Sequence, residues 1–290
     1  MITATSPRVT APAVEPRARP AGRNRRRRRA AGPTYLVAAL AFLYLPVAVV
    51  VLFSFNADST LKLPITGFSL RWYDQVLTDP TYTMALKHSL FVAGVCAVCT
   101  TLIGTLAAFG LTKVGPRLRG SLAVLFFVPI TLPGLFLGLS LLTWFSKLNI
   151  QLSLWTVAAA HVVYTFPYFL LVARSVLDRI DPQYDEIAAD LGASSTRRFL
   201  KVTLPMTWPI LAAAGLLSFV LSFDEFFITF FVIGPDSTVP LVVYSAMRRA
   251  IDPSINAFAT LLMLITLLSG VAIAVLARAG RTVKKGVKAS

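Results

Sequence analysis

An all-α membrane protein with six transmembrane helices is the fold class that this sequence predicts. Of its 290 residues, 56% are hydrophobic and only 14% are charged, whereas soluble proteins carry about 25% charged residues. The mean hydropathy is +0.71. Six apolar runs are each long enough, at about 20 residues, to cross a bilayer as a helix. Helices are required there because lipid offers no hydrogen-bond partner to backbone amides.

The six predicted spans follow one another along the chain. We place them at residues 35–55, 84–111, 121–145, 153–177, 208–233 and 257–279. Prolines such as Pro129, Pro133 and Pro167 lie inside these spans. Each proline removes one backbone hydrogen bond and bends its helix, so we expect an irregular bundle.

The distribution of basic residues predicts the orientation of the bundle. If both termini lie on the same side of the membrane, that side holds 22 of the 28 Lys and Arg residues. Basic residues concentrate on the cytoplasmic side of membrane proteins, so we expect both termini in the cytoplasm. The same asymmetry accounts for most of the net charge of +15. A nucleic-acid partner is therefore not needed to explain that charge.

Two tails flank the spans. Residues 1–32 are rich in Ala, Pro and Arg, and we expect a disordered tail there because they contain too little apolar surface to fold. The run Arg25–Arg29 is typical of a topology signal that also attracts anionic membrane lipid. A nucleic-acid-binding arm is the less favoured interpretation. The six-span domain then covers residues 33–280, and residues 281–290 form a second cytoplasmic tail.

Motifs for catalysis or metal binding are missing from the sequence. It contains no phosphate-binding loop, no H-E-x-x-H and no G-x-S-x-G, and it has only two histidines, His88 and His161. Cys96 and Cys99 share one face of a predicted span, where small side chains assist packing. We therefore predict a non-catalytic membrane subunit with no cofactor and no metal of its own.

A charged insert separates the fourth and fifth spans. Asp181 is placed to cap a short helix, and Gly192 to end it in the left-handed conformation. A second short helix follows Ser194 and is expected to end before Pro205. Two short helices joined by glycine would project from the membrane as a docking surface for a partner. An ordinary solvated connector is the alternative interpretation.

The same insert resembles the cytoplasmic loop of permease subunits in binding-protein-dependent ABC importers of type I. The pattern in that family is E-A-A, three residues, Gly, nine residues, Ile, one residue and Leu-Pro. Its positions are occupied here by Glu186, Ala188, Gly192, Leu204 and Pro205, with Ile187 and Val202 as mild departures. The resemblance implies the type I permease fold and a coupling loop over residues 178–207. It also implies that these residues, together with Ala193, engage a groove of an ATPase subunit.

The resemblance further implies a set of partners. They are a second, similar permease, two ATPase subunits that bind ATP and magnesium, and a substrate-binding protein outside a bacterial inner membrane. Transport would then occur without covalent chemistry in this chain. A stand-alone secondary transporter and a membrane enzyme are the rival classes of function.

An acidic pair, Asp224 and Glu225, lies within the fifth predicted span among several phenylalanines. A charged carboxylate near the bilayer centre costs about 2.5–3.5 kcal/mol or more, so both groups must face water, a partner or a substrate. A substrate with ammonium groups would supply the countercharge, and aromatic faces such as that of Phe223 would add cation–π attraction. A structural ion pair or a hydrogen bond between helices is the alternative.

Other stretches resemble the second permease of spermidine/putrescine importers. They are residues 43–46, 54–56, 222–226, 234–235, 240–245 and 256–260. This resemblance implies polyamine transport, with Asp224, Glu225, Phe223 and Trp72 as substrate-binding candidates. Ferric iron, thiamine or an opine remain alternative substrates.

Overall fold

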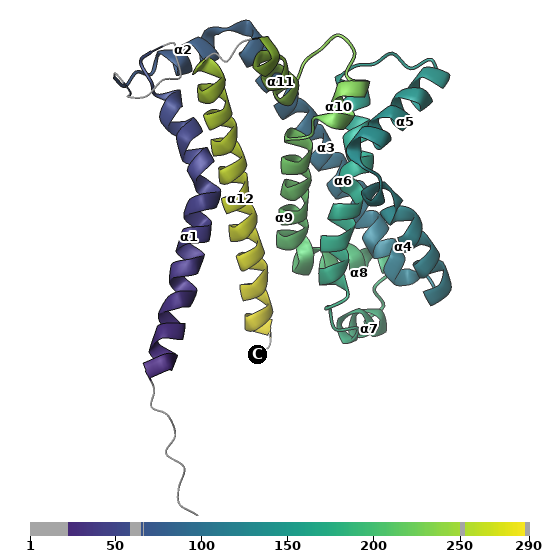
Figure 1. Ribbon diagram of the computed structural model, residues 1–290. Coiled ribbons are helices and arrows are strands. Elements are labelled where there is room, and N and C mark those ends of the chain that lie inside the picture. The colour runs from purple at the N-terminus through teal and green to yellow at the C-terminus, as the bar shows by residue number, and fades with distance from the viewer. Residues whose placement is uncertain (1–22, 59–64, 66, 250–252, 288–290) are drawn as a thin grey trace, which may run out of the picture. The chain divides into compact units, whose positions relative to one another are not determined.

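The computed structural model describes residues 23–58, 65, 67–249 and 253–287 (Figure 1). The chain divides into two compact units, Met1–Val49 and Val50–Ser290. The described residues are mainly helical, with one isolated bridge between Asn56 and Phe68. The prediction of an all-α fold is therefore confirmed.

Five helices within the described residues are long and apolar enough to cross a membrane, and a bent pair brings the number to six. The long helices are α1 (Arg23–Ser54), α3 (Pro80–Lys113), α6 (Leu154–Leu177), α9 (Leu204–Phe223) and α12 (Pro253–Val287), and the bent pair is α4 (Pro116–Thr131) with α5 (Gly134–Lys147).

The third predicted span is not one continuous helix. Helices α4 and α5 meet at an angle of 104°, so the bend predicted at the intramembrane prolines is a sharp break in the span 121–145. Pro133 causes the break, because it donates no hydrogen bond and disfavours helical geometry at the preceding Leu132. Leu132 is extended, with ψ at 128°, and α5 begins immediately after Pro133.

Both ends of the six-span domain are more helical than the sequence predicted. Helix α1 begins at Arg23 and therefore includes residues 23–32 of the segment assigned to the first tail. Helix α12 continues through Val287 into the segment assigned to the second tail. Residues 1–22 and 288–290 lie outside the described residues, and there the predicted tails stay predictions.

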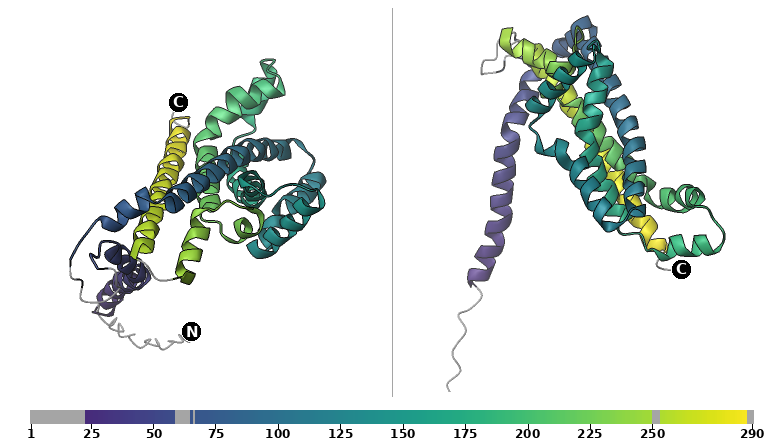
Figure 2. Two further views of the ribbon diagram at one scale, coloured as in Figure 1. Left: turned by 90° about the horizontal axis from the view of Figure 1, so that it is seen from above. Right: turned by 90° about the vertical axis from the view of Figure 1, so that its right-hand side faces the viewer.

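Helices α3, α6 and α9 form the centre of the second unit, and α12 packs on α9 (Figures 1 and 2). One apolar cluster joins these three helices around Phe169, which is 0% exposed. Gly104 on α3 lies directly beneath the ring of Phe169. The missing side chain of Gly104 allows α3 and α6 to approach closely, as small residues do in membrane bundles.

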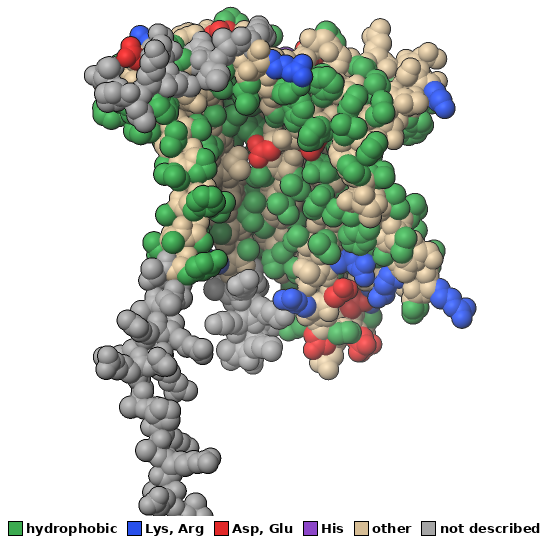
Figure 3. Space-filling model, in the orientation of Figure 1, with side chains coloured by type: hydrophobic (Ala, Val, Ile, Leu, Met, Phe, Trp, Pro, Cys, Tyr) green, Lys and Arg blue, Asp and Glu red, His purple; other side chains and the backbone are tan. Residues whose placement is uncertain are grey.

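The opposite ends of this unit differ in character. At one end, α2 (Arg71–Thr78) and α11 (Val239–Arg249) pack on α3 and α12 in an apolar cluster. At the other end, α7 (Gln183–Asp190) and α8 (Ser195–Arg198) carry the charged insert. A space-filling view shows blue and red side chains gathered at this second end, below a largely green surface (Figure 3).

The close approach at Gly104 leads to a stability prediction. Gly104→Ala should destabilise the protein, because the added methyl group overlaps the ring of Phe169. Overpacking of this kind costs about 1–3 kcal/mol. Gly94→Ala on the same helix is the matched control, because its methyl group meets no atom within 4 Å. Melting temperatures in detergent should fall for Gly104→Ala only; equal melting temperatures would contradict the packing argument.

Candidate coupling and substrate sites

The charged insert folds as two short helices joined by glycine, as predicted. We name residues 181–198 the knob. Asp181 Oδ1 accepts a hydrogen bond from the Gln183 amide at 3.1 Å, which caps α7. Gly192 adopts a left-handed φ of 77°, and Ser194 Oγ accepts from the Arg197 amide at 3.4 Å to cap α8. The knob stands out from the α3–α6–α9 bundle in the right-hand view of Figure 2.

Pro205 does not end the second short helix, which corrects the sequence prediction. A π-helical turn over Phe199–Thr203 joins α8 directly to α9, in which Pro205 occupies the first turn. The Leu204 amide bonds to the carbonyl of Phe199, five residues earlier. This wider turn relieves the clash that a proline ring makes with the carbonyl four residues before it. One helical run therefore extends from Ser195 to Phe223.

An exposed apolar stripe runs along α7. Tyr184, Ile187 and Leu191 are 37%, 57% and 83% exposed, and α7 contains no buried residue. Their spacing places them on one face of the helix. Sequence reasoning missed these residues as a site, although their three- and four-residue spacing in a charged helix was the available signal. An unpartnered apolar stripe on a polar projection is typical of a docking surface.

Asp185 anchors the knob to the bundle. Its Oδ2 contacts Lys113 Nζ at 2.9 Å and Arg198 Nη1 at 3.1 Å, and Arg198 Nη1 also donates to the Asp185 carbonyl at 3.2 Å. The rings of Phe109 and Phe199 lie 4.5 Å apart beside these ion pairs. The end of α3 is thereby connected to both helices of the knob.

The predicted coupling residues occupy two places. Glu186 and Gly192 are exposed on the knob, where Ala188 and Ala193 are half-buried. Leu204 instead packs against the apolar cluster of α3, α6 and α9. Of the predicted residues, Glu186 and Gly192 on the knob and Pro205 at the start of α9 are therefore exposed.

The acidic pair lies at a corner and not inside a continuous helix, which corrects the predicted span 208–233. Helix α9 ends at Phe223, and α10 (Phe227–Val232) begins after Phe226. We name residues 224–226 the acidic corner. Side chains take over the hydrogen bonds that the break releases: Glu225 Oε1 accepts from the Ile228 amide at 3.0 Å, and Thr229 Oγ1 donates to the Glu225 carbonyl at 2.9 Å.

The two acidic side chains therefore have different surroundings. Asp224 is exposed, whereas Glu225 is half-buried and caps the start of α10. A Cβ atom on Gly134, the first residue of α5, would lie 3.4 Å from Glu225 Oε1. Glu225 thus lies next to the beginnings of two helices, where backbone amides favour a negative charge. Neither of the two ion pairs among the described residues involves this corner.

Aromatic rings surround the acidic corner, but the two predicted aromatic candidates are buried. Phe226 lies 4.8 Å from the ring of Tyr244 on α11 and 5.9 Å from that of Phe230. Phe223 is 2% exposed, and Trp72 is 8% exposed with its Nε1 donating to the Asn56 carbonyl at 2.7 Å. These placements favour packing roles for Phe223 and Trp72 over contact with a substrate.

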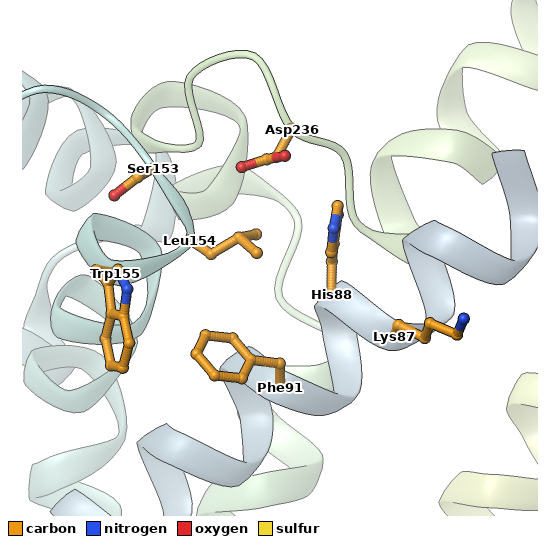
Figure 4. A pocket seen from close by; sticks show the side chains of 7 residues that line it. All are labelled: Lys87, His88, Phe91, Ser153, Leu154, Trp155 and Asp236. Atoms are coloured by element: carbon orange, nitrogen blue, oxygen red, sulfur yellow. The ribbon is translucent and has the colours of Figure 1, made fainter. Parts of the chain in front are cut away.

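A pocket of about 420 Å³ opens among residues from α3, α6 and the segment before α11. Figure 4 shows Asp236, Ser153 and His88 on one side of it and the rings of Phe91 and Trp155 on the other. It includes none of the predicted site residues. No group of three or more His, Cys, Asp or Glu side chains suited to a metal occurs in the part of the chain that the structure describes.

Residues 100–281, more than half of the chain, match the family described as "Binding-protein-dependent transport system inner membrane component". The chain belongs to this family. The matched region includes the knob, both helix breaks and the acidic corner. As a member of the family, the chain is a membrane-embedded permease.

Curated relatives of this permease cover most of its length. PotC is the permease protein of a spermidine/putrescine transport system of Escherichia coli K12. It is 33% identical to this chain over an alignment that covers 84% of this chain and 92% of PotC. PotI, a putrescine transport permease of the same strain, is 37% identical over 79% of this chain and 84% of PotI. PhnV of Salmonella typhimurium LT2, a putative 2-aminoethylphosphonate transport permease, is 31% identical over 83% of this chain and 91% of PhnV.

Solved structures show the same fold. A chain of a bacterial ABC transporter that imports the acidic polysaccharide alginate superimposes with a TM-score of 0.67 at 14% identity, covering 87% of this permease and 96% of that chain. A chain of the MetNI methionine ABC transporter gives a TM-score of 0.59 at 16% identity. The superposition covers 69% of this permease and 96% of that chain. The predicted ABC importer permease fold is confirmed.

The anchoring of the knob can be tested on the purified permease. Asp185→Asn should increase amide hydrogen exchange in residues 183–198 several-fold, because it weakens the contacts to both Lys113 and Arg198. Exposed ion pairs of this kind contribute about 0.2–1 kcal/mol each. Asp190→Asn, which makes the same charge change at an exposed position of α7, is the control. Equal exchange in the two variants would show that Asp185 does not restrain the knob.

Proposed function

We propose that this chain is the transmembrane permease of an ATP-driven importer of polyamines such as spermidine and putrescine. The acidic corner is the observation that carries the substrate class. Two carboxylates at a helix break within an apolar bundle lack a basic partner among the ion pairs of the described residues. A substrate with several ammonium groups supplies the missing charge. The names of the relatives PotC and PotI support this choice.

In this proposal the two carboxylates act differently. Asp224, the exposed member, pairs with an ammonium group, while Glu225 holds the corner in shape and adds negative potential. The aromatic rings of Phe226 and Phe230 line the same region. Each aromatic face can contribute about 0.5–2 kcal/mol of cation–π attraction to an ammonium group.

The knob couples transport to ATP in this proposal. Its apolar stripe seats in an ATPase subunit, which binds ATP and magnesium and moves the knob when it closes. The run Ser195–Phe223 leads without interruption from the knob to the acidic corner. When the knob moves, this helical run moves the residues that bind the substrate. The movement exposes the acidic corner alternately to the two sides of the membrane.

The remaining partners follow from the same proposal. A second permease completes the passage, a second ATPase subunit serves it, and a binding protein delivers substrate from outside the inner membrane. The knob and both termini lie in the cytoplasm, in line with the distribution of Lys and Arg.

A second candidate substrate is 2-aminoethylphosphonate, which the name of the relative PhnV favours. It carries one ammonium group together with an anionic phosphonate. The Arg248 guanidinium, which lies 4.8 Å from the ring of Tyr244 beside Phe226, would be available to the phosphonate, but a single ammonium group leaves the second carboxylate of the corner without a countercharge. We therefore favour polyamines.

Uptake by the complete complex in vesicles tests the substrate class. Radiolabelled spermidine or putrescine should accumulate with ATP, and excess 2-aminoethylphosphonate should not compete. Asp224→Asn should raise the KM for spermidine about tenfold, which corresponds to about 1.4 kcal/mol for one lost charge interaction. Asp74→Asn, at an exposed position of α2, is the charge-matched control. Uptake of 2-aminoethylphosphonate but of neither polyamine would refute the assignment.

Pull-down of the ATPase subunit tests the coupling surface. Leu191→Glu should reduce recovery of the ATPase at least about tenfold, because it places a charge in an apolar contact. Ala189→Glu adds the same charge at an exposed position of α7 outside the stripe and should leave recovery unchanged. Membrane insertion of both variants serves as the folding check. Normal recovery with Leu191→Glu would place the docking surface elsewhere.

A further inference from the structure

A buried histidine on a different helix forms hydrogen bonds to residues on both sides of the acidic corner. His161 on α6 is 1% exposed and lies between Ser222, near the end of α9, and Thr229 on α10. Its Nδ1 lies 2.7 Å from Ser222 Oγ and its Nε2 lies 2.9 Å from Thr229 Oγ1. One imidazole ring thus bridges the two helices that the corner separates.

The hydrogen-bond network specifies the tautomer of this ring. Thr229 Oγ1 donates its hydrogen to the Glu225 carbonyl at 2.9 Å, so it accepts a hydrogen from His161 Nε2. His161 Nδ1 then accepts from Ser222 Oγ. A neutral imidazole, with one donor and one acceptor, satisfies both contacts.

Both hydroxyl residues that His161 contacts also bond the backbone of Glu225. The Glu225 amide donates to the Ser222 carbonyl at 3.4 Å, and the Glu225 carbonyl accepts from Thr229 Oγ1. Ser222 and Thr229 are 3% and 0% exposed, so water cannot replace a lost partner. The position of Glu225, and of the adjacent Asp224, therefore depends on the contacts of His161.

We propose that His161 is a positioning residue that fixes the acidic corner for substrate by bridging Ser222 and Thr229. This inference rests on the proposed role of the corner in binding ammonium groups. In this proposal His161 does not contact the substrate, but it controls the affinity for substrate through the position of the acidic corner. A buried histidine that only stabilised the bundle would affect folding without affecting affinity selectively.

The test uses the complete complex in proteoliposomes, with spermidine as the probe. Thr229→Val removes one hydroxyl without changing side-chain volume greatly, and His161→Leu removes the bridge entirely. Each should raise the KM for spermidine about tenfold, the equivalent of about 1.4 kcal/mol, and change the maximal rate by less than about twofold. Thr229→Ser and His161→Gln keep hydrogen-bonding groups and should restore part of the affinity.

Thr100→Val is the matched control. Thr100 on α3 is 0% exposed, and its hydroxyl bonds Thr165 at 3.0 Å and Cys96 Sγ at 3.7 Å, so it bonds neither Thr229 nor the backbone of Glu225. It should lower the melting temperature as Thr229→Val does but leave the KM unchanged. An equal rise in KM for Thr100→Val would show general loosening of the bundle and overturn the proposal. So would an unchanged KM in Thr229→Val, which covers the case in which His161→Leu fails to fold.

A second readout needs no substrate. In a chain with Cys99 replaced by serine and the fully buried Cys96 retained, Asp224→Cys reports the geometry of the corner through its rate of labelling by a thiol reagent. Thr229→Val should change this rate several-fold, and Thr100→Val should not; no change with Thr229→Val would overturn the inference. If the corner responds in this way but spermidine is not transported, the substrate assignment fails and the positioning role stands.

Discussion

Backbone amide groups inside a membrane need partners within the protein, and this requirement governs both breaks in the helical bundle. At the acidic corner, the Glu225 carboxylate and the Thr229 hydroxyl replace the hydrogen bonds that a continuous helix would make. At the α4–α5 bend, Pro133 has no amide hydrogen, so one fewer backbone group needs a hydrogen-bond partner. The second break lies close to the first, with Gly134 beside Glu225. A single carboxylate thus caps the start of α10 and lies against the start of α5.

The π-helical turn before α9 gives the molecule its mechanical continuity. A proline stop at position 205 would have isolated the knob from the transmembrane bundle. The wider turn over Phe199–Thr203 instead joins the knob and α9 in one run that ends at the acidic corner. Asp185 adds a second connection from the knob to α3. The knob is therefore joined to the bundle through two helices, α9 and α3.

The sequence predicted those features that depend on local chemistry or on length. The apolar runs located the spans, and Asp181, Gly192 and Ser194 located the caps and the turn of the knob, because each acts on its own few neighbours. The bend at Pro133 was predicted, although its angle of 104° was not, and the break at Asp224 was missed because no proline or glycine marks it in the sequence. The burial of Trp72 and Phe223 depends on tertiary packing. Hydropathy cannot distinguish an aromatic ring that packs from one that meets a ligand.

The closeness of Gly134 and Glu225 has a consequence for how this protein can diverge. Any side chain at position 134 would abut the carboxylate, and an acidic one would set two negative charges beside each other. Evolutionary replacement at one of these positions therefore alters which residues are tolerated at the other. Among descendants that acquire new solutes, we expect this pair to covary, although its members are separated by 91 positions of sequence.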